Sequence, residues 1–221
     1  MISPREEKVE RRLTTPRAAA VAGLLFALLF ATVLILIRTA LPEDLSETSA
    51  AIERAAGQLR VAVTLMPFAG IAFLWFVGVI RDRLGELEDR FFASVMFGSA
   101  LLFLAMLFVA MALAGGLLVA AGSAVDPVDQ KIVRFGREIM LQISNVYALR
   151  MAGVFMISLG TIWLRTGLMP RWLVVTTYAL ALMLLVVVTL SVWVTLAFPA
   201  WVTLVSCLIL VRTFRAKPRP D

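Results

Sequence analysis

Histidine is absent from this chain, and cysteine is represented by Cys207 alone. Without histidine the chain lacks the commonest metal ligand of proteins and the usual acid–base group for reactions near neutral pH. A single cysteine excludes a disulfide within the chain. The sequence also has no nucleophile elbow and no glycine-rich phosphate loop. We therefore expect a protein that is not an enzyme, with no catalytic residues, no metal site and no cofactor.

Charge is also missing from long parts of the chain. Four stretches hold no Asp, Glu, Lys or Arg, namely 18–37, 61–80, 91–125 and 172–211. At about 1.5 Å per helical residue, each stretch is long enough to cross a hydrocarbon core of about 30 Å. The chain is 61% apolar, compared with about 45–50% for soluble domains. The sequence therefore predicts an all-α, polytopic integral membrane protein.

The uncharged stretches divide into six predicted spans that form about three hairpins. The first four lie at about 18–37, 60–80, 91–118 and 145–164, and the last stretch is long enough for two more. We place the turn between the last two at 196–199, because Pro199 is unfavourable inside a helix. Trp193 and Trp201 flank that turn, so we expect both at one membrane surface. The other three tryptophans are expected at the opposite surface: Trp75, Trp163 and Trp172.

The basic residues predict the orientation. With six spans, 14 Lys and Arg residues lie on the side of the two termini and six on the other side, with Arg150 within a span. The positive-inside rule then places both termini in the cytoplasm. We expect a multi-pass protein of the bacterial inner or plasma membrane, with a tail at 1–17, one transmembrane domain at 18–214 and a basic tail at 215–221. The net charge of +6 follows from this bias, and no nucleic-acid partner is expected.

Both predicted outer loops carry the pattern of an amphipathic helix. Each opens with a proline beside acidic residues, Pro42 in one loop and Pro127 in the other, which suits the first turn of a helix. Apolar residues then recur at spacings of three and four. In the second loop they are Ile132, Phe135, Ile139 and Ile143. We therefore predict amphipathic outer helices before the second and fourth spans, each able to continue into the span.

The junctions of these loops with the following spans resemble each other. The sequence 59–62 reads Leu-Arg-Val-Ala, and the sequence 149–152 reads Leu-Arg-Met-Ala. The same offset of 90 residues pairs Met66 with Met156 and Gly70 with Gly160. Either the chain contains a repeated unit in the same membrane direction, or apolar composition produces these matches by chance.

Arg150 is the charged residue that falls within a predicted span. A charge at that depth is costly, which makes it a candidate functional residue. The fourth span must extend back to about Asn145 to cross the bilayer, so Arg150 lies about 8 Å below the outer surface. One interpretation is an anion or lipid-headgroup site formed by Arg150, Tyr147, Asn145 and Arg60. The other is an arginine that anchors its helix by extending towards the headgroups.

The loop between the second and third spans contains a short motif. Gly78, Asp82, Arg83 and Gly85 form the pattern G-x-x-x-D-R-x-G. This pattern is similar to the loop motif of major facilitator transporters, which also follows their second helix. The resemblance covers about ten residues, and the basic pair that should follow is replaced by Glu-Leu. It implies a loop that locks helices together during alternating access. The other interpretation is a short solvated loop with weak internal ion pairs.

Two classes of function remain open. The absence of Asp and Glu from the spans, together with outer helices that offer a partner surface, favours a non-catalytic accessory, assembly or lipid-interacting factor. Its partners would be membrane lipids and either another protein or further copies of the chain. The alternative is a small transporter or channel that acts as a homo-oligomer, favoured by the repeat, by Arg150 and by the loop motif.

Overall fold

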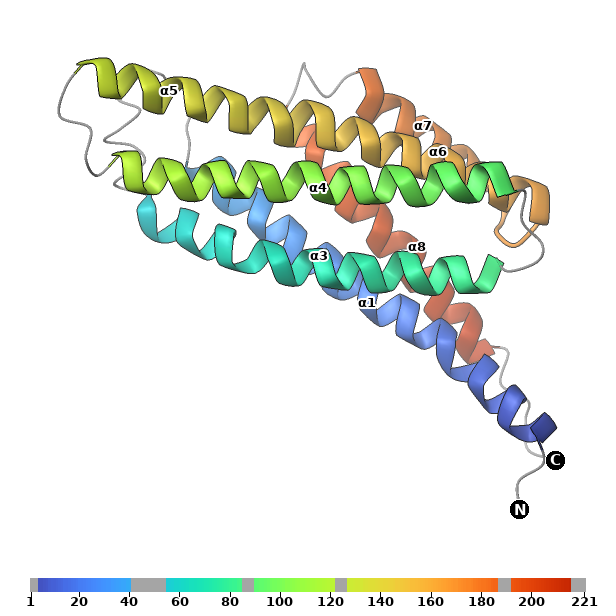
Figure 1. The fold of residues 1–221 in the computed structure, drawn as a ribbon. Coiled ribbons are helices and arrows are strands. Elements are labelled where there is room, and N and C mark those ends of the chain that lie inside the picture. The colour runs from blue at the N-terminus through green and yellow to red at the C-terminus, as the bar shows by residue number, and fades with distance from the viewer. Residues whose placement is uncertain (1–3, 41–54, 85–89, 122–126, 187–191, 216–221) are drawn as a thin grey trace.

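The structure is a computed structural model, which describes residues 4–40, 55–84, 90–121, 127–186 and 192–215. These residues form helices and contain no strand. The helices, in chain order, are α1 (Pro4–Ala40), α3 (Ala56–Leu84), α4 (Arg90–Ala121), α5 (Pro127–Gln142), the π-helix η2 (Ile143–Ala148), α6 (Leu149–Thr166), α7 (Arg171–Val186), the 3-10 helix η3 (Val192–Leu196) and α8 (Ala197–Arg215). They pack lengthwise into one elongated bundle, in which α1 starts and α8 finishes at the same end (Figure 1).

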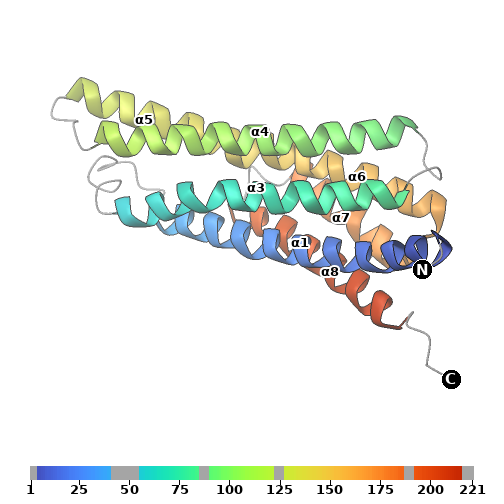
Figure 2. The same ribbon diagram turned by 60° about the horizontal axis from the view of Figure 1, so that its bottom comes forward.

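Five of the helical stretches are long and apolar enough to cross a membrane, which agrees with a multi-pass membrane protein. They are Arg17–Ala40, Ala56–Asp82, Phe91–Ala120, Gln130–Thr166 and Val194–Phe214. The remaining apolar helix, α7, is shorter, with 16 described residues. At 1.5 Å per residue it covers about 24 Å, less than a full hydrocarbon core. Figures 1 and 2 both show α4 and the continuous α5–α6 helix running side by side.

The fourth predicted span is longer in the structure than in the sequence analysis. The elements α5, η2 and α6 follow one another without a break, so one helix runs from Pro127 to Thr166. Pro127 occupies its first position, where a missing N–H costs nothing. The second outer loop therefore continues directly into the span. Most of the first outer loop, 41–54, lies outside the described residues.

The apolar stripe of α5 is not the face that the helix buries. Ile132 and Phe135 remain 60% and 68% exposed, whereas Val133, Arg137 and Met140 are buried. These buried residues are four and three positions apart, and the next buried residue, four positions on, is Ser144 in η2. Hence α5 places an arginine against the bundle and leaves Ile132 and Phe135 on the outside.

The prediction of the last turn and of the aromatic belt was wrong in part. Pro199 lies in the first turn of α8, where proline is tolerated. Trp201 is 1% exposed, and its Nε1 donates to Thr177 Oγ1 at 2.9 Å, so the indole N–H has an acceptor inside the bundle. Trp163 is also buried, at 3% exposure, whereas Trp75 and Trp172 are exposed. The side chain of Trp193 lies outside the described residues.

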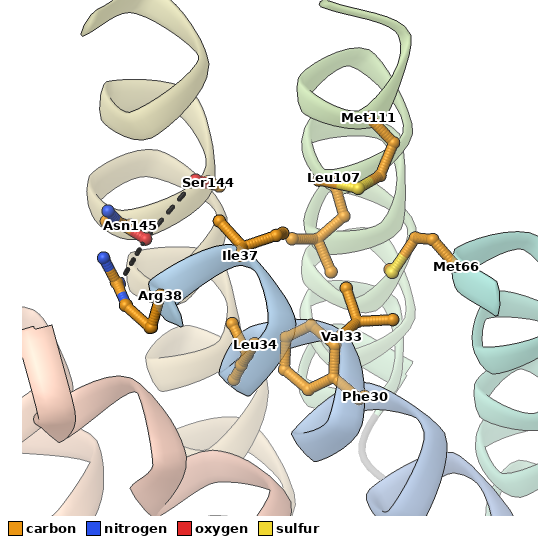
Figure 3. A pocket seen from close by; sticks show the side chains of 10 residues that line it. All are labelled: Phe30, Val33, Leu34, Ile37, Arg38, Met66, Leu107, Met111, Ser144 and Asn145. Atoms are coloured by element: carbon orange, nitrogen blue, oxygen red, sulfur yellow. Dashed lines mark hydrogen bonds between the residues drawn. The ribbon is translucent and has the colours of Figure 1, made fainter. Parts of the chain in front are cut away.

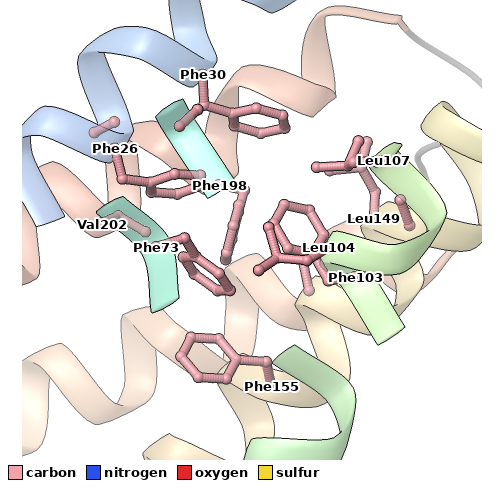
Figure 4. Packing of buried hydrophobic residues seen from close by; sticks show 14 of the residues in the cluster. Phe26, Phe30, Phe73, Phe103, Leu104, Leu107, Leu149, Phe155, Phe198 and Val202 are labelled. Carbon is pink, nitrogen blue, oxygen red and sulfur yellow. The ribbon is translucent and has the colours of Figure 1, made fainter. Parts of the chain in front are cut away.

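Aromatic rings fill the centre of the bundle (Figure 4). The ring centroid of Phe198 in α8 lies 5.0 Å from that of Phe103 in α4 and 6.0 Å from that of Phe73 in α3. Phe26 of α1 lies 4.7 Å from Phe73. Most of these pairs are tilted or edge-to-face, the arrangement that aromatic rings prefer. The middle of the bundle is therefore apolar and closely packed among the described residues.

The positions matched by the offset of 90 are packed in similar ways in the second and fourth spans. In both α3 and the η2–α6 helix, the leucine, alanine and methionine matched by the offset of 90 are buried: Leu59, Ala62, Met66 and Leu149, Ala152, Met156. The matched glycines both face the next helix. A Cβ on Gly70 would overlap Phe108 of α4, and one on Gly160 would touch Thr177 of α7. The matched residues of α3 and of the η2–α6 helix therefore face the inside of the bundle in both cases.

Candidate functional site

Arg38 and Asn145 join the end of α1 to the π-helix across 107 residues of sequence. Arg38 Nη2 donates to Asn145 Oδ1 at 2.8 Å. Ser144 Oγ donates to the same oxygen at 3.3 Å (Figure 3). A hydrogen bond from a charged donor is stronger than one between neutral groups. We call this end of the bundle the amide end, because a side-chain amide accepts the arginine there.

The π-helix positions Asn145 for this contact. Ser144, Val146 and Ala148 are buried within η2, and Asn145 is partly buried between Ser144 and Val146. A π-turn inserts an extra residue into an α-helix and often marks a functional position. In this chain the wider turn takes up one residue between α5 and α6, at the level where α1 ends.

A small hollow lies beneath the Arg38–Asn145 contact. Its volume is about 10 Å³, room for about one water molecule. Arg38, Ser144 and Asn145 form its polar side. Apolar side chains from α1, α3 and α4 form the rest: Phe30, Val33, Leu34, Ile37, Met66, Leu107 and Met111 (Figure 3). The hollow is too small for an organic substrate.

Arg150 follows Asn145 by five residues in the same helix, which corresponds to about 7.5 Å along the axis. Its side chain is partly exposed, and its Nε atom is buried without a hydrogen-bond partner among the described residues. A buried donor that lacks an acceptor is costly and calls for an explanation. Tyr147, one turn before it, is 53% exposed.

The residues of the predicted headgroup site lie on two helices. Asn145, Tyr147 and Arg150 share one helix, whereas Arg60 is an exposed residue near the start of α3. The sequence analysis did not single out Arg38, the residue that contacts Asn145. Its position directly after an uncharged run was visible, but no sequence pattern indicated a partner 107 residues away.

The predicted lock in the loop after α3 is described in part. Gly78 and Asp82 are exposed, and a Cβ on Gly78 would meet no described atom within 4 Å. The Arg83 side chain and Gly85 lie outside the described residues. The neighbouring Arg81 instead lies over the ring of Phe97 in α4, at 4.7 Å from carbon ζ to the centroid.

Two further arginines at this end also lie over phenyl rings. Arg17 of α1 lies 5.1 Å from the ring centroid of Phe214, and Arg165 of α6 lies 4.7 Å from that of Phe92. We call this end of the bundle the ring end. Within the described residues, no group of three His, Cys, Asp or Glu side chains is placed to hold a metal ion.

Comparisons with protein families, with curated proteins and with solved structures found no match to this chain.

Proposed function

We propose that this chain is a non-catalytic membrane factor that binds a phospholipid headgroup through Arg150 at the amide end. The observation that carries the proposal is the Arg150 guanidinium, which is partly exposed and has a buried Nε without an acceptor. Phosphate oxygens supply the acceptors that a guanidinium fork prefers. The lipid would bind the exposed part of this guanidinium, beside the buried Nε.

The depth of Arg150 in the bundle supports a headgroup as its ligand. Arg17 and Arg38 enclose 20 uncharged residues of α1, which puts them about 32 Å apart, close to the thickness of a hydrocarbon core. Because Arg38 contacts Asn145, both lie near one edge of that core. Arg150 then lies about 7.5 Å below the edge, within reach of headgroups for a long side chain.

The orientation belongs to the same proposal. The amide end faces the outside of a bacterial plasma membrane, and the ring end faces the cytoplasm together with both termini. The excess of Lys and Arg on the side of the termini supports this orientation. Exposed Trp75 and Trp172, which lie towards the ring end, are typical of a membrane–water interface.

The packing of the centre favours this proposal over transport. A transporter or channel needs a polar path past the middle of the bilayer, and the described middle is filled by Phe73, Phe103, Phe198 and their neighbours. The hollow at the amide end has room for about one water. The transporter alternative would gain support if purified protein in vesicles released a trapped solute faster than empty vesicles do.

The test measures lipid retained by the full-length protein. The protein is purified from vesicles of phosphatidylethanolamine and phosphatidylglycerol, and bound lipid is counted by native mass spectrometry. We expect Arg150→Gln to reduce the affinity for one lipid about fivefold, since a basic residue near the headgroups contributes about 1 kcal/mol. Arg150→Lys should lose less, because it keeps the charge without the fork.

Lys131→Gln is the matched control. It removes the same charge at the same end of the bundle, from an exposed position on α5. We expect it to leave the lipid count unchanged. Equal losses for Lys131→Gln and Arg150→Gln would mean general attraction of the surface for lipid, and no loss for Arg150→Gln would overturn the proposal.

A further inference from the structure

The helix that carries Arg150 is the most buried of the candidate membrane spans. In Gln130–Thr166, 67% of the residues in the most apolar stretch are buried, against 39–50% in the other four candidate spans. Its α6 part packs against both α4 and α7, whereas α4 and α7 have almost no contact with each other among the described residues. α6 therefore separates these two helices.

One narrow face of α6 stays open to the surroundings of the bundle. Between residues 149 and 163, five side chains are partly exposed and the others are buried. Four of the five follow one another at spacings of four, three and four, which keeps them within about 60° of each other around the helix. We call this face the α6 stripe, and it consists of Arg150, Val154, Ile157 and Thr161.

Two glycines bring α7 close to α6 along one side of the stripe. A Cβ on Gly153 would lie 3.1 Å from a side-chain carbon of Leu185 and 3.2 Å from the carbonyl oxygen of Ala181. A Cβ on Gly160 would lie 3.4 Å from the side chain of Thr177. Both glycines lie about 80° around the helix from the stripe. α7 therefore forms a close wall beside it.

The α6 stripe has a polar group at each end. Arg150 is at one end, and at the other Thr161 Oγ1 and Tyr178 OH of α7 lie 2.8 Å apart and share a hydrogen bond. From Arg150 to Thr161 the stripe is about 16 Å long, close to the half-thickness of about 15 Å that one leaflet contributes to the hydrocarbon core. Only Val154 and Ile157, both apolar, lie between these ends.

The depth of the stripe indicates what covers its apolar part. Val154 and Ile157 lie about 6 Å and 10.5 Å beyond Arg150 along the helix, away from the amide end. At that depth in a membrane no water is available, so an apolar surface is covered by protein or by acyl chains. Both side chains stay partly exposed beside their protein neighbours, which leaves an acyl chain as the occupant.

We infer that the α6 stripe holds one acyl chain of the phospholipid whose headgroup binds Arg150. The inference rests on the proposed function, because a phosphate at Arg150 places the first carbons of the chain at the end of the stripe. The close wall of α7 gives this chain a fixed neighbour, so it exchanges more slowly than lipid on an exposed helix face. The ligand is therefore a phospholipid that the protein recognises by its headgroup and by one chain together.

The experiment uses the full-length protein in nanodiscs containing phosphatidylglycerol with a photoreactive diazirine in the middle of one chain. After illumination, the labelled residues are identified by mass spectrometry. Leu182 of α7 is the control, because it is 61% exposed and lies at a similar depth, next to Ala181, whose carbonyl faces Gly153. We expect Val154 and Ile157 to be labelled several times more than Leu182. Labelling that instead follows exposure would show passing lipid only and overturn the inference.

A second measurement blocks the stripe. Ile157→Trp places an indole where the chain would lie, and we expect it to lower the affinity for phosphatidylglycerol about fivefold in native mass spectrometry. Leu182→Trp adds the same ring at an exposed position of α7 and should leave the affinity unchanged. Equal affinities for the two variants would contradict a chain held on the stripe.

Free palmitate distinguishes a phospholipid from a single-chain lipid. We expect unlabelled phosphatidylglycerol to compete with the diazirine lipid for Val154 and Ile157, and palmitate at the same concentration to leave the labelling unchanged. Equal competition by both would assign the stripe to any acyl chain and contradict recognition together with the headgroup.

Arg150→Gln separates this inference from the proposed function. If this variant loses lipid while labelling of the unmodified protein follows exposure, the headgroup site stands and the chain site fails. If the variant keeps its lipid count and its labelling of Val154 and Ile157, the proposed function fails and the stripe holds a chain without it.

Discussion

The two ends of the bundle use arginine in different ways. At the amide end Arg38 donates to Asn145 across the bundle at 2.8 Å. At the ring end arginines lie over phenyl rings on the surface. A hydrogen bond from a charged group contributes about 1.5–3 kcal/mol and needs a defined direction, whereas an exposed cation–π contact contributes about 0.5–1 kcal/mol and tolerates variation. The amide end thus fixes one arrangement, and the ring end limits movement while leaving charge at the surface.

The comparison assumes a common rigid middle, and Phe198→Ala tests that assumption with the largest expected effect. Removing a fully buried ring from an aromatic core costs about 3–5 kcal/mol. The free energy of unfolding is measured in mixed micelles by tryptophan fluorescence, to which buried Trp201 contributes. Phe68→Ala, at a 59% exposed position of α3, is the control and should change stability much less. Similar losses for the two variants would contradict the packed centre.

Asn145→Leu is the most direct test of the difference between the two ends. It removes the acceptor of Arg38 and should destabilise the protein by about 1.5–3 kcal/mol in the same measurement. Gln142→Leu, at an exposed position one turn earlier, provides the control. If both variants unfold like the unmodified protein, the contact between α1 and η2 contributes nothing and the distinction between the ends is lost.

Phe97→Leu has the smallest expected effect. It keeps an apolar side chain but removes the ring beneath Arg81, at an expected cost of about 0.5–1 kcal/mol. Phe68→Leu shortens a ring without an arginine contact among the described residues and corrects for the loss of apolar surface. A loss as large as that of Asn145→Leu would mean that the ring end is fixed as firmly as the amide end.

The fold class followed from the sequence because it depends on simple quantities. Uncharged runs of 20 residues or more predicted helices able to cross a membrane, and the structure has them. The burial of Trp163 and Trp201 inside the bundle could not be predicted from the sequence in this way. Tryptophan prefers interfaces on average, but an indole whose N–H has an acceptor packs well inside, and Thr177 is 24 residues from Trp201.

Only the part of the candidate site that depends on local sequence could be predicted. The cost of a charge within an apolar run marked Arg150, and its neighbours Tyr147 and Asn145 were found with it. Arg38 was missed because its contact depends on how α1 packs against η2. The arginines at the ring end were counted for orientation, but their rings lie on other helices.

The π-helix also keeps α5 and α6 in one angular frame. Its wide turn takes up one extra residue, so the two helices bury the faces that an α-helix one residue shorter would bury. If Ile143–Ala148 became α-helical at its present length, α5 would turn by about 100° relative to α6, and Arg137 would leave the bundle. Deleting a single residue in this segment should restore an ordinary α-helix and leave the same face of α5 buried. The width of one turn therefore decides which face of α5 is buried, independently of the side chains that the face carries.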